Sequence, residues 1–179
     1  GANLVRELLN KKINPHIIVR DESNLWRIKD IIKNTQVHYA DLINFTEINS
    51  LIKKIKPRTI FHLAAYGAYA FQNDKELIKS SILDSTINFL DICAETGFDV
   101  FINTGSNSEY GFMDHAMSEV DTLRPNSYYS VFKSAATLYC QYTSIEKRLP
   151  IITVRPFHVY GPYEENTRLI PVLVNHLLN

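Results

Sequence analysis

The stretch DVFINTGSNSEYG, residues 99–111, indicates what fold the rest of the chain must complete. Its first half is an almost continuous run of β-branched and aromatic residues, typical of a strand covered on both faces. Its second half is a loop of glycine and small hydroxyl-bearing residues. A buried strand followed by such a loop is typical of open α/β sheets, which bind ligands beyond the carboxyl ends of their strands.

In the rest of the chain, further strand-like runs alternate with helical patterns. Further strand-like runs are HIIVR (16–20), QVHYA (36–40), TIFHLAA (59–65) and IITVRPF (151–157). Helical periodicity marks residues 2–12, 24–33, 45–55, 74–96 and 127–147. Strand–helix alternation predicts right-handed crossovers and a parallel, doubly wound α/β sheet.

Composition narrows the class of protein. The 179 residues are 45% hydrophobic and 21% charged, which fits one ordinary globular domain. Nineteen basic residues balance nineteen acidic ones, so we expect no nucleic acid or membrane partner drawn in by bulk charge. Cys93 and Cys140 lie in apolar helical stretches without metal-ligand spacing, so we expect buried thiols and no metal; a disulfide or a reactive thiol is the alternative. Neither a signal sequence nor a membrane span is evident, and we expect a cytoplasmic protein.

The chain opens on a helical pattern, GANLVRELL (1–9), with no strand ahead of it. In a doubly wound sheet a strand feeds that first helix through a glycine-rich turn that holds a pyrophosphate. Here Gly1 alone represents that turn. The chain is either a domain that begins with a helix or, as we expect, a fragment whose first strand precedes Gly1.

Tyr129 and Lys133 carry the clearest chemical pattern. Residues four apart share one face of a helix, so these two side chains can form one site while Tyr128 points elsewhere. A nearby ammonium stabilises a phenolate, and we therefore expect Lys133 to lower the pKa of Tyr129 toward the range useful for proton transfer. A buried tyrosine and a solvated lysine are the structural alternative.

Ser106 lies in the loop that follows the strand at 99–103. Its hydroxyl could bind a substrate oxygen while Tyr129 moves the proton. The alternative is a turn in which serine and glycine serve only the local backbone.

Four motifs in register resemble those of the extended short-chain dehydrogenase/reductase family of nucleotide-sugar epimerases, dehydratases and reductases. They are HLAA (62–65), TGSNSEYG (104–111), Tyr129 with Lys133, and RPFHVYGP (155–162). The resemblance implies a Rossmann-type NAD(P)-binding domain over residues 1–179, lacking its first strand and, after about residue 165, most of the substrate domain. It also implies hydride transfer between a sugar carbon and nicotinamide.

The resemblance assigns roles to individual positions. Ser106, Tyr129 and Lys133 match the catalytic trio, in which tyrosine is the acid–base, lysine also binds the nicotinamide ribose and serine orients the sugar oxygen. Cofactor contacts are implied at Gly1, Arg20, Asp41, Leu42, Leu63, Ala64, Ala65, Thr104, Pro156 and Phe157, besides Tyr129 and Lys133. Substrate contacts are implied at Ser106, Asn107, Ser108, His158 and Arg168. A capped surface turn would equally explain Asp41, and strand packing would explain Leu63.

Two departures from the family pattern bear on the reaction. The 4,6-dehydratases of the family carry an Asp-Glu pair where this chain has Asn107-Ser108. An amide and a hydroxyl cannot replace two carboxylates as acid and base, so reduction or epimerisation is favoured over dehydration. His158 stands where many relatives have a substrate-binding asparagine.

The choice of cofactor depends on the end of the strand at 16–20. An acidic residue there binds the adenosine ribose of NAD, whereas an arginine favours the 2′-phosphate of NADP. Arg20 falls in that position, which favours NADP. A one-residue shift would place Asp21 there and favour NAD, and a solvated Arg–Asp pair without a cofactor role is the third interpretation.

Three functions are compatible with these residues. We expect an NADPH-dependent reductase of a 4-keto-(di)deoxy nucleotide sugar, similar to abequose and paratose synthases. An NAD-dependent nucleotide-sugar 4-epimerase and a non-catalytic nucleotide-binding module are the alternatives, and we expect the fragment itself to bind dinucleotide poorly. The family implies a homodimer through helices 74–96 and 127–147, although Leu83, Ile87, Leu90 and Leu138 there could be ordinary core.

Overall fold

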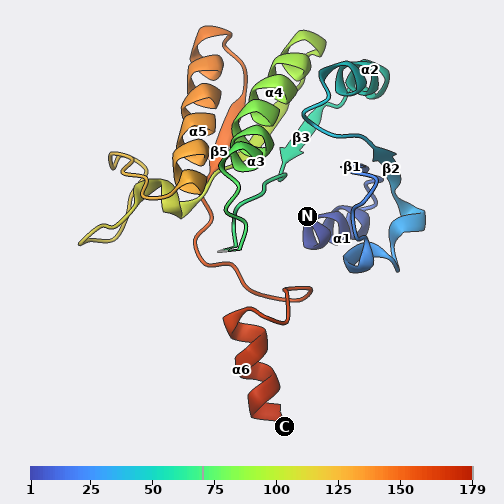
Figure 1. The fold of residues 1–179 in the computed structure, drawn as a ribbon. Helices are drawn as coiled ribbons and strands as arrows, with labels where there is room; N and C mark the ends of the chain where they lie inside the picture. Colours follow the sequence, from blue (N-terminus) through green and yellow to red (C-terminus); the bar gives the residue numbers. More distant parts are fainter. Residues whose placement is uncertain (70, 179) are drawn as a thin grey trace. The chain divides into compact units, whose positions relative to one another are not determined.

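The computed structural model describes residues 1–69 and 71–178 (Figure 1). The chain divides into two compact units. One contains Gly1–Ala40 and the segment from His158 onward, and the other contains Asp41–Phe157. Each unit is described by itself below.

The five predicted strands are confirmed. They are β1 (His16–Val19), β2 (Gln36–Tyr39), β3 (Thr59–His62), β4 (Val100–Thr104) and β5 (Ile151–Val154). Each pair of neighbouring strands runs parallel, as predicted. Among the described residues the strands form two sheets, β1-β2 in the first unit and β3-β4-β5 in the second.

In the first unit, α1 (Ala2–Asn10) precedes β1, and α6 (Leu169–Leu178), which the sequence did not predict, follows residue 168. The helix predicted at 24–33 is wrong. Two single 3-10 turns, η1 (Trp26–Ile28) and η2 (Ile32–Asn34), stand in its place. Each turn is closed by backbone hydrogen bonds that span three residues. Ile28 is the one buried residue in the two turns, so this segment has no long apolar face whose burial would stabilise a continuous α-helix.

The second unit places helices against the three-stranded sheet. They are α2 (Phe45–Ile55), α3 (Lys75–Lys79), α4 (Ser85–Thr96) and α5 (Tyr128–Glu146), with a 3-10 turn η4 (Asn107–Tyr110) after β4. The single helix predicted at 74–96 is interrupted by the π-helical segment η3 (Ser80–Asp84), which separates α3 from α4. Helices α4 and α5 lie side by side (Figure 1).

The core of the second unit lies between α4, α5 and the sheet. Phe101 and Leu90 are fully buried, and the ring of Phe101 packs at a tilt against those of Phe89 and His62. Cys93 and Cys140 are free and buried, as predicted, and burial raises the pKa of both thiols to about 12. Both cysteines are therefore protonated core residues at neutral pH.

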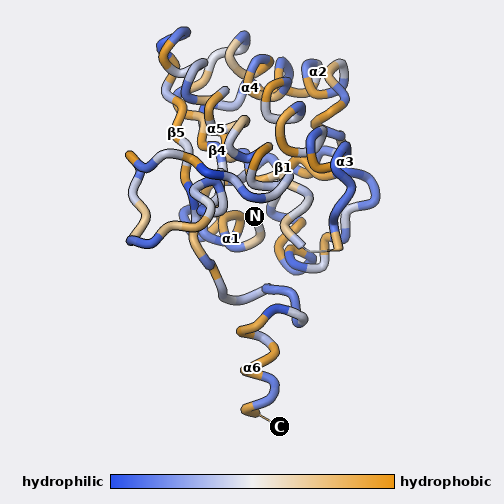
Figure 2. The backbone as a smooth tube through the Cα atoms, turned by 60° about the vertical axis from the view of Figure 1, so that its left-hand side comes forward, coloured by the Kyte–Doolittle hydropathy of each residue, from blue (hydrophilic) through white to orange (hydrophobic). Residues whose placement is uncertain are grey.

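Helix α6 contains many apolar residues, which Figure 2 colours orange. The side chains of Leu177 and Leu178 are 84% and 79% exposed. No helix within residues 1–69 and 71–178 combines the length and the apolar character needed to span a membrane.

Candidate active site

A capping box at Ser127 starts helix α5. The Ser127 hydroxyl accepts a hydrogen bond from the Ser130 N–H at 3.2 Å, and the Ser127 N–H donates to the Ser130 hydroxyl at 2.9 Å. These bonds satisfy backbone donors that a helix start would otherwise leave unpaired. The cap thus fixes Tyr129 in the first turn and Lys133 in the second.

Tyr129 and Lys133 lie on one face of α5. The Lys133 Nζ is 5.9 Å from the centroid of the Tyr129 ring, and Lys133 is only 5% exposed. Tyr128 is 56% exposed, and the amine of Lys75 lies 5.7 Å from its ring. The structure therefore brings Tyr129 and Lys133 together and leaves Tyr128 outside the pair.

Lys133 also connects α5 to the carboxyl end of β4. Its Nζ donates a hydrogen bond to the backbone carbonyl of Thr104 at 2.7 Å. Burial lowers the pKa of Lys133 to about 8, against the opposing effect of the Glu109 carboxylate. The Thr104 hydroxyl beside it is buried and has no hydrogen-bond partner among the described residues. The edge of the sheet predicted to bind cofactor thus holds a buried amine and an unpaired hydroxyl.

Ser106 caps the short turn η4 and faces the phenol of Tyr129. Its hydroxyl accepts a hydrogen bond from the Ser108 N–H at 3.2 Å and lies 2.8 Å from the Ser108 hydroxyl. Ser106 also lies near enough to the phenol of Tyr129 to act on its pKa. The three residues of the predicted trio therefore come together at the end of β4, although Ser106 serves the local turn as well.

The pKa of Tyr129 shifts in the direction opposite to the sequence expectation. Burial raises its pKa, the Ser106 side chain opposes this, and the Glu109 carboxylate raises it further. The prediction that Lys133 makes this phenol more acidic is thus wrong for this structure. The physical reason is that burial removes water from the phenol and so disfavours the phenolate.

Sequence reasoning missed a buried charge pair beneath this site. Glu109 is fully buried, and its Oε1 accepts from the Ser106 N–H at 2.8 Å. Its Oε2 accepts from Arg155 Nε at 2.7 Å, and Arg155 Nη1 donates to the Tyr110 hydroxyl at 2.9 Å. A signal was present, because Glu109 and Arg155 are charged residues within the two quoted motifs TGSNSEYG (104–111) and RPFHVYGP (155–162).

Leu63, Ala64 and Ala65 continue from the end of β3 beside this site. The parallel register pairs His62 with Asn103, so the residues after each strand emerge at the same edge of the sheet. All three are exposed, Leu63 by 42%. His62 before them is buried against Thr86, and burial lowers the pKa of its imidazole to about 3, which leaves it neutral.

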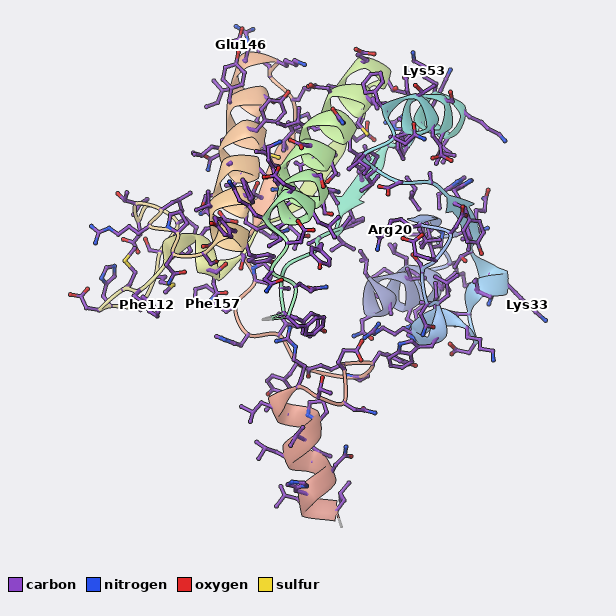
Figure 3. The ribbon with its side chains drawn as sticks, in the orientation of Figure 1. Arg20, Lys33, Lys53, Phe112, Glu146 and Phe157 are labelled. Atoms are coloured by element: carbon purple, nitrogen blue, oxygen red, sulfur yellow. The ribbon has the colours of Figure 1, made fainter. Side chains whose placement is uncertain are left out.

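Pro156 and Phe157 follow β5 and lie next to the Ser106 loop. The Pro156 carbonyl accepts from the Asn107 N–H at 3.3 Å, and the Gly105 N–H donates to the Val154 carbonyl at 2.8 Å. Phe157 is 53% exposed (Figure 3). The backbones expected to contact substrate and nicotinamide thus lie side by side.

Asp41 and Leu42 begin the second unit. The Asp41 carboxylate accepts from the Ile43 N–H at 3.1 Å, and its carbonyl accepts from the Asn44 N–H at 2.9 Å. Asn44 then caps α2. The capped turn weighed as an alternative is therefore present, and a contact with adenine stays a prediction.

The remaining predicted residues belong to the first unit. Gly1 is the N-cap of α1, and Arg20 follows β1, where its Nε lies 3.2 Å from a Glu22 carboxylate oxygen (Figure 3). The carbonyl of Arg168 accepts from the Val172 N–H at 3.0 Å, and His158 opens the final segment. Their relation to Tyr129 stays a prediction.

All 179 residues match the sequence model of a family described as "NAD dependent epimerase/dehydratase family". One similar protein is the dTDP-D-glucose 4,6-dehydratase of Dictyostelium discoideum, 26% identical over all of this chain and 46% of its own length. Another is a trifunctional UDP-glucose 4,6-dehydratase, UDP-4-keto-6-deoxy-D-glucose 3,5-epimerase and UDP-4-keto-L-rhamnose reductase of Arabidopsis thaliana. It is 31% identical over 78% of this chain and 21% of its own length.

Among solved structures, the UDP-glucuronic acid 4-epimerase of Bacillus cereus in complex with NAD superimposes with a TM-score of 0.84. It is 25% identical over 99% of this chain and 59% of its own. These matches confirm the predicted Rossmann-type fold class and the resemblance to nucleotide-sugar enzymes. The chain spans about half the length of the first curated relative.

Proposed function

The chain belongs to the NAD-dependent epimerase/dehydratase family, and from that premise we propose that the protein reduces a 4-keto-(di)deoxy nucleotide sugar with NADPH. Addition of hydride to the keto carbon and of a proton from Tyr129 to the keto oxygen would convert the C=O double bond into a C–O single bond with one new C–H and one new O–H bond, and leave Tyr129 as phenolate. A reductase activity stands in the name of the similar Arabidopsis protein.

The observation that carries the proposal is the meeting of Ser106, Tyr129 and Lys133 at the end of β4. A phenol with a raised pKa is protonated at neutral pH, which is the form that can donate to a ketone oxygen as hydride arrives. Ser106 would hold the same oxygen by a hydrogen bond.

The residues at the sheet edge fit a nicotinamide dinucleotide. Ala64 and Ala65 are small and exposed, so backbone can approach a diphosphate closely, and Lys133 and the unpaired Thr104 hydroxyl supply hydrogen-bonding groups for a ribose. When bound, the dinucleotide would supply the hydride. Arg20 after β1 supports NADP, and NAD, which the similar Bacillus cereus structure contains, is the alternative.

A nucleotide-sugar 4-epimerase is the second candidate. It would first oxidise the sugar, and for that step Tyr129 must accept a proton as phenolate. The raised pKa of Tyr129 makes this form scarcer. Asn107 and Ser108 supply no carboxylate for dehydration, and a non-catalytic module would not need the trio that this chain retains.

Cofactor stoichiometry tests the proposal. The full-length protein that contains this chain is mixed with NADPH and the 4-keto-6-deoxy forms of dTDP-, UDP-, CDP- and GDP-glucose, and absorbance at 340 nm is followed together with product. A reductase oxidises one NADPH for each sugar reduced. Product formed from a nucleotide sugar without a net change in NADPH would contradict this choice and favour the epimerase.

We also propose that two copies associate through helix α5. Val131, Leu138, Tyr142 and Ile145 form a stripe on α5, and their exposure rises from 42% at Val131 to 80% at Ile145. Leu90 on α4 is fully buried and belongs to the core instead. An exposed apolar stripe of this kind supports a contact with a second copy.

A further inference from the structure

Glu109 lies in the turn that presents Ser106, yet it is fully buried. Each of its carboxylate oxygens has a different partner. Oε1 accepts from the Ser106 N–H at 2.8 Å, and Oε2 accepts from Arg155 Nε at 2.7 Å. One side chain therefore joins the turn after β4 to the residue that follows β5.

Arg155 is also held on more than one side. Its side chain is 12% exposed, its Nη1 donates to the Tyr110 hydroxyl at 2.9 Å, and its guanidinium lies 4.9 Å from the centroid of the Tyr110 ring. A Cβ added at Gly105 would lie 2.5 Å from Glu109 Oε1. The carboxylate is thus packed directly against the loop backbone, with no space for it to move toward Gly105.

Stability alone does not explain such a pair. Two buried charges lose their hydration, and well-packed apolar residues of similar volume often stabilise a fold as well or better. This pair, however, lies where the strand ends carrying Ser106 and Pro156 meet. A charge-assisted hydrogen bond between Glu109 and Arg155, with a second bond from the same guanidinium to Tyr110, fixes both distance and direction between two loops, which an apolar contact does not.

We propose that Glu109 and Arg155 are positioning residues, whose buried ion pair holds the Ser106 loop against the end of β5 so that the Ser106 hydroxyl stays within reach of the Tyr129 phenol. The inference rests on the proposed function, because the positioned group is the one that would bind the sugar oxygen. Neither residue touches the reacting atoms.

The charge of Glu109 also reaches the proton-transfer pair. The groups facing it are Arg155 after β5, Tyr110 in its own turn, and Tyr129, Lys133 and Cys140 on α5. Besides the larger effects of burial, the carboxylate raises the pKa of Tyr129, Lys133 and Cys140. A change that removes this charge lowers the pKa of Tyr129 and Lys133, and so moves a pH profile as well as a rate.

The experiment compares the wild type with Glu109→Gln and with the double variant Glu109→Gln/Arg155→Met. The double variant removes both charges, so no buried ion loses its partner, and it is expected to fold. Arg58→Met/Asp99→Asn is the matched control. It removes a bidentate pair of similar length, 2.7 and 2.8 Å, that is exposed and precedes β3 and β4, at the opposite end of the sheet.

Two measurements are made on each protein. Amide hydrogen exchange of residues 104–111 reports the loop without requiring turnover. Steady-state rates are measured against pH with the nucleotide sugar that the stoichiometry test identifies as substrate, and they report kcat and KM. We expect these amides to exchange at least tenfold faster in the double variant than in the wild type. We also expect kcat of the double variant to fall at least tenfold while its KM stays within threefold. Glu109→Gln should shift the pH profile to lower pH. The control pair should match the wild type in all of these.

The proposal would be overturned if the loop amides of the double variant exchanged at the wild-type rate. It would also be overturned if Glu109→Gln lost rate uniformly at every pH and its pH profile did not shift. If the double variant does not fold, Arg155→Lys keeps the charge and loses the fork, and wild-type loop exchange and kcat in that variant would overturn the proposal equally. If the wild type turns over no nucleotide sugar, the proposed function fails, whereas the exchange measurement still decides whether the pair holds the loop.

Discussion

The amine of Lys133 donates a hydrogen bond to the backbone carbonyl of Thr104 across 2.7 Å, joining α5 to the carboxyl end of β4. This bond places the lysine between the phenol of Tyr129 and the strand end that precedes Ser106. The position has an electrostatic cost, because burial lowers the pKa of Lys133 to about 8.

That cost predicts how stability depends on pH. Between about pH 8 and the ordinary value of 10.5, the unfolded chain still binds a proton that folded Lys133 has released, so its contribution makes the free energy of unfolding rise with pH. The rise is on the order of 3 kcal/mol at most. Lys133→Met lacks this contribution.

Urea unfolding of both proteins at pH 7.5, 9 and 10.5 checks this prediction. Burial raises the pKa of Cys93 and Cys140 to about 12, so these thiols lower the free energy of unfolding as pH rises above 9. Subtracting the Lys133→Met values removes their effect. A wild-type minus variant difference that stays constant from pH 7.5 to 10.5 would contradict the lowered pKa.

Gly105→Ala should destabilise the second unit. The added Cβ would lie 2.5 Å from Glu109 Oε1 and 3.1 Å from Thr153 Cγ2, so the buried pair must shift. We expect a loss of about 1–3 kcal/mol in the free energy of unfolding, as for other overpacked cores. Gly1→Ala is the control, because its Cβ would meet no atom within 4 Å. Equal urea midpoints for the two variants would show that the loop is not tightly packed.

The strands were predictable because their apolar runs are short, β-branched and bounded by polar residues. The observed strand β4 covers Val100–Thr104 within the quoted run 99–105. Tyr129 and Lys133 were predictable as a pair because helical spacing is fixed once Ser127 sets the helix start. The local pattern was sufficient in both cases.

Other features depend on tertiary contacts that the spacing of residues along the sequence does not predict. The π-helical turn at Ser80–Asp84 inserts into a segment whose apolar pattern predicted one helix. The raised pKa of Tyr129 follows from burial, which the four-residue spacing to Lys133 does not report. Glu109 and Arg155 are 46 residues apart in sequence, and only the parallel pairing of β4 with β5 brings them together.

Tyr139→Phe tests the contact between α4 and α5. The Tyr139 hydroxyl lies 2.8 Å from both carboxylate oxygens of Asp91, which retains only a longer contact of 3.5 Å to Lys147 if that hydroxyl is removed. We expect a loss of about 1–2 kcal/mol in the free energy of unfolding. Tyr128→Phe is the matched control on the same helix, because that tyrosine is 56% exposed and lies outside the apolar stripe. Indistinguishable urea curves for the two variants would count against a structural role for the bond to Asp91.

Leu138→Glu tests the proposed association through α5. Leu138 is 56% exposed at the middle of the apolar stripe, and a carboxylate there would have to lose its hydration in a dimer interface. Light scattering after size-exclusion chromatography should show the wild type at twice the mass of the variant at the same concentration. Val120→Glu, at a position 92% exposed outside the helices, should keep the wild-type mass. A monomeric wild type would refute the dimer.

The most direct measurement compares Tyr129→Phe with Tyr128→Phe in steady-state reduction of the nucleotide sugar by NADPH. Both changes remove one hydroxyl from adjacent residues of α5, but only the Tyr129 phenol meets Ser106 and Lys133. We expect kcat to fall by about 10²–10⁴-fold in Tyr129→Phe, the usual contribution of general acid catalysis, and to stay within about twofold in Tyr128→Phe. Wild-type turnover by folded Tyr129→Phe would show that the proton comes from another group.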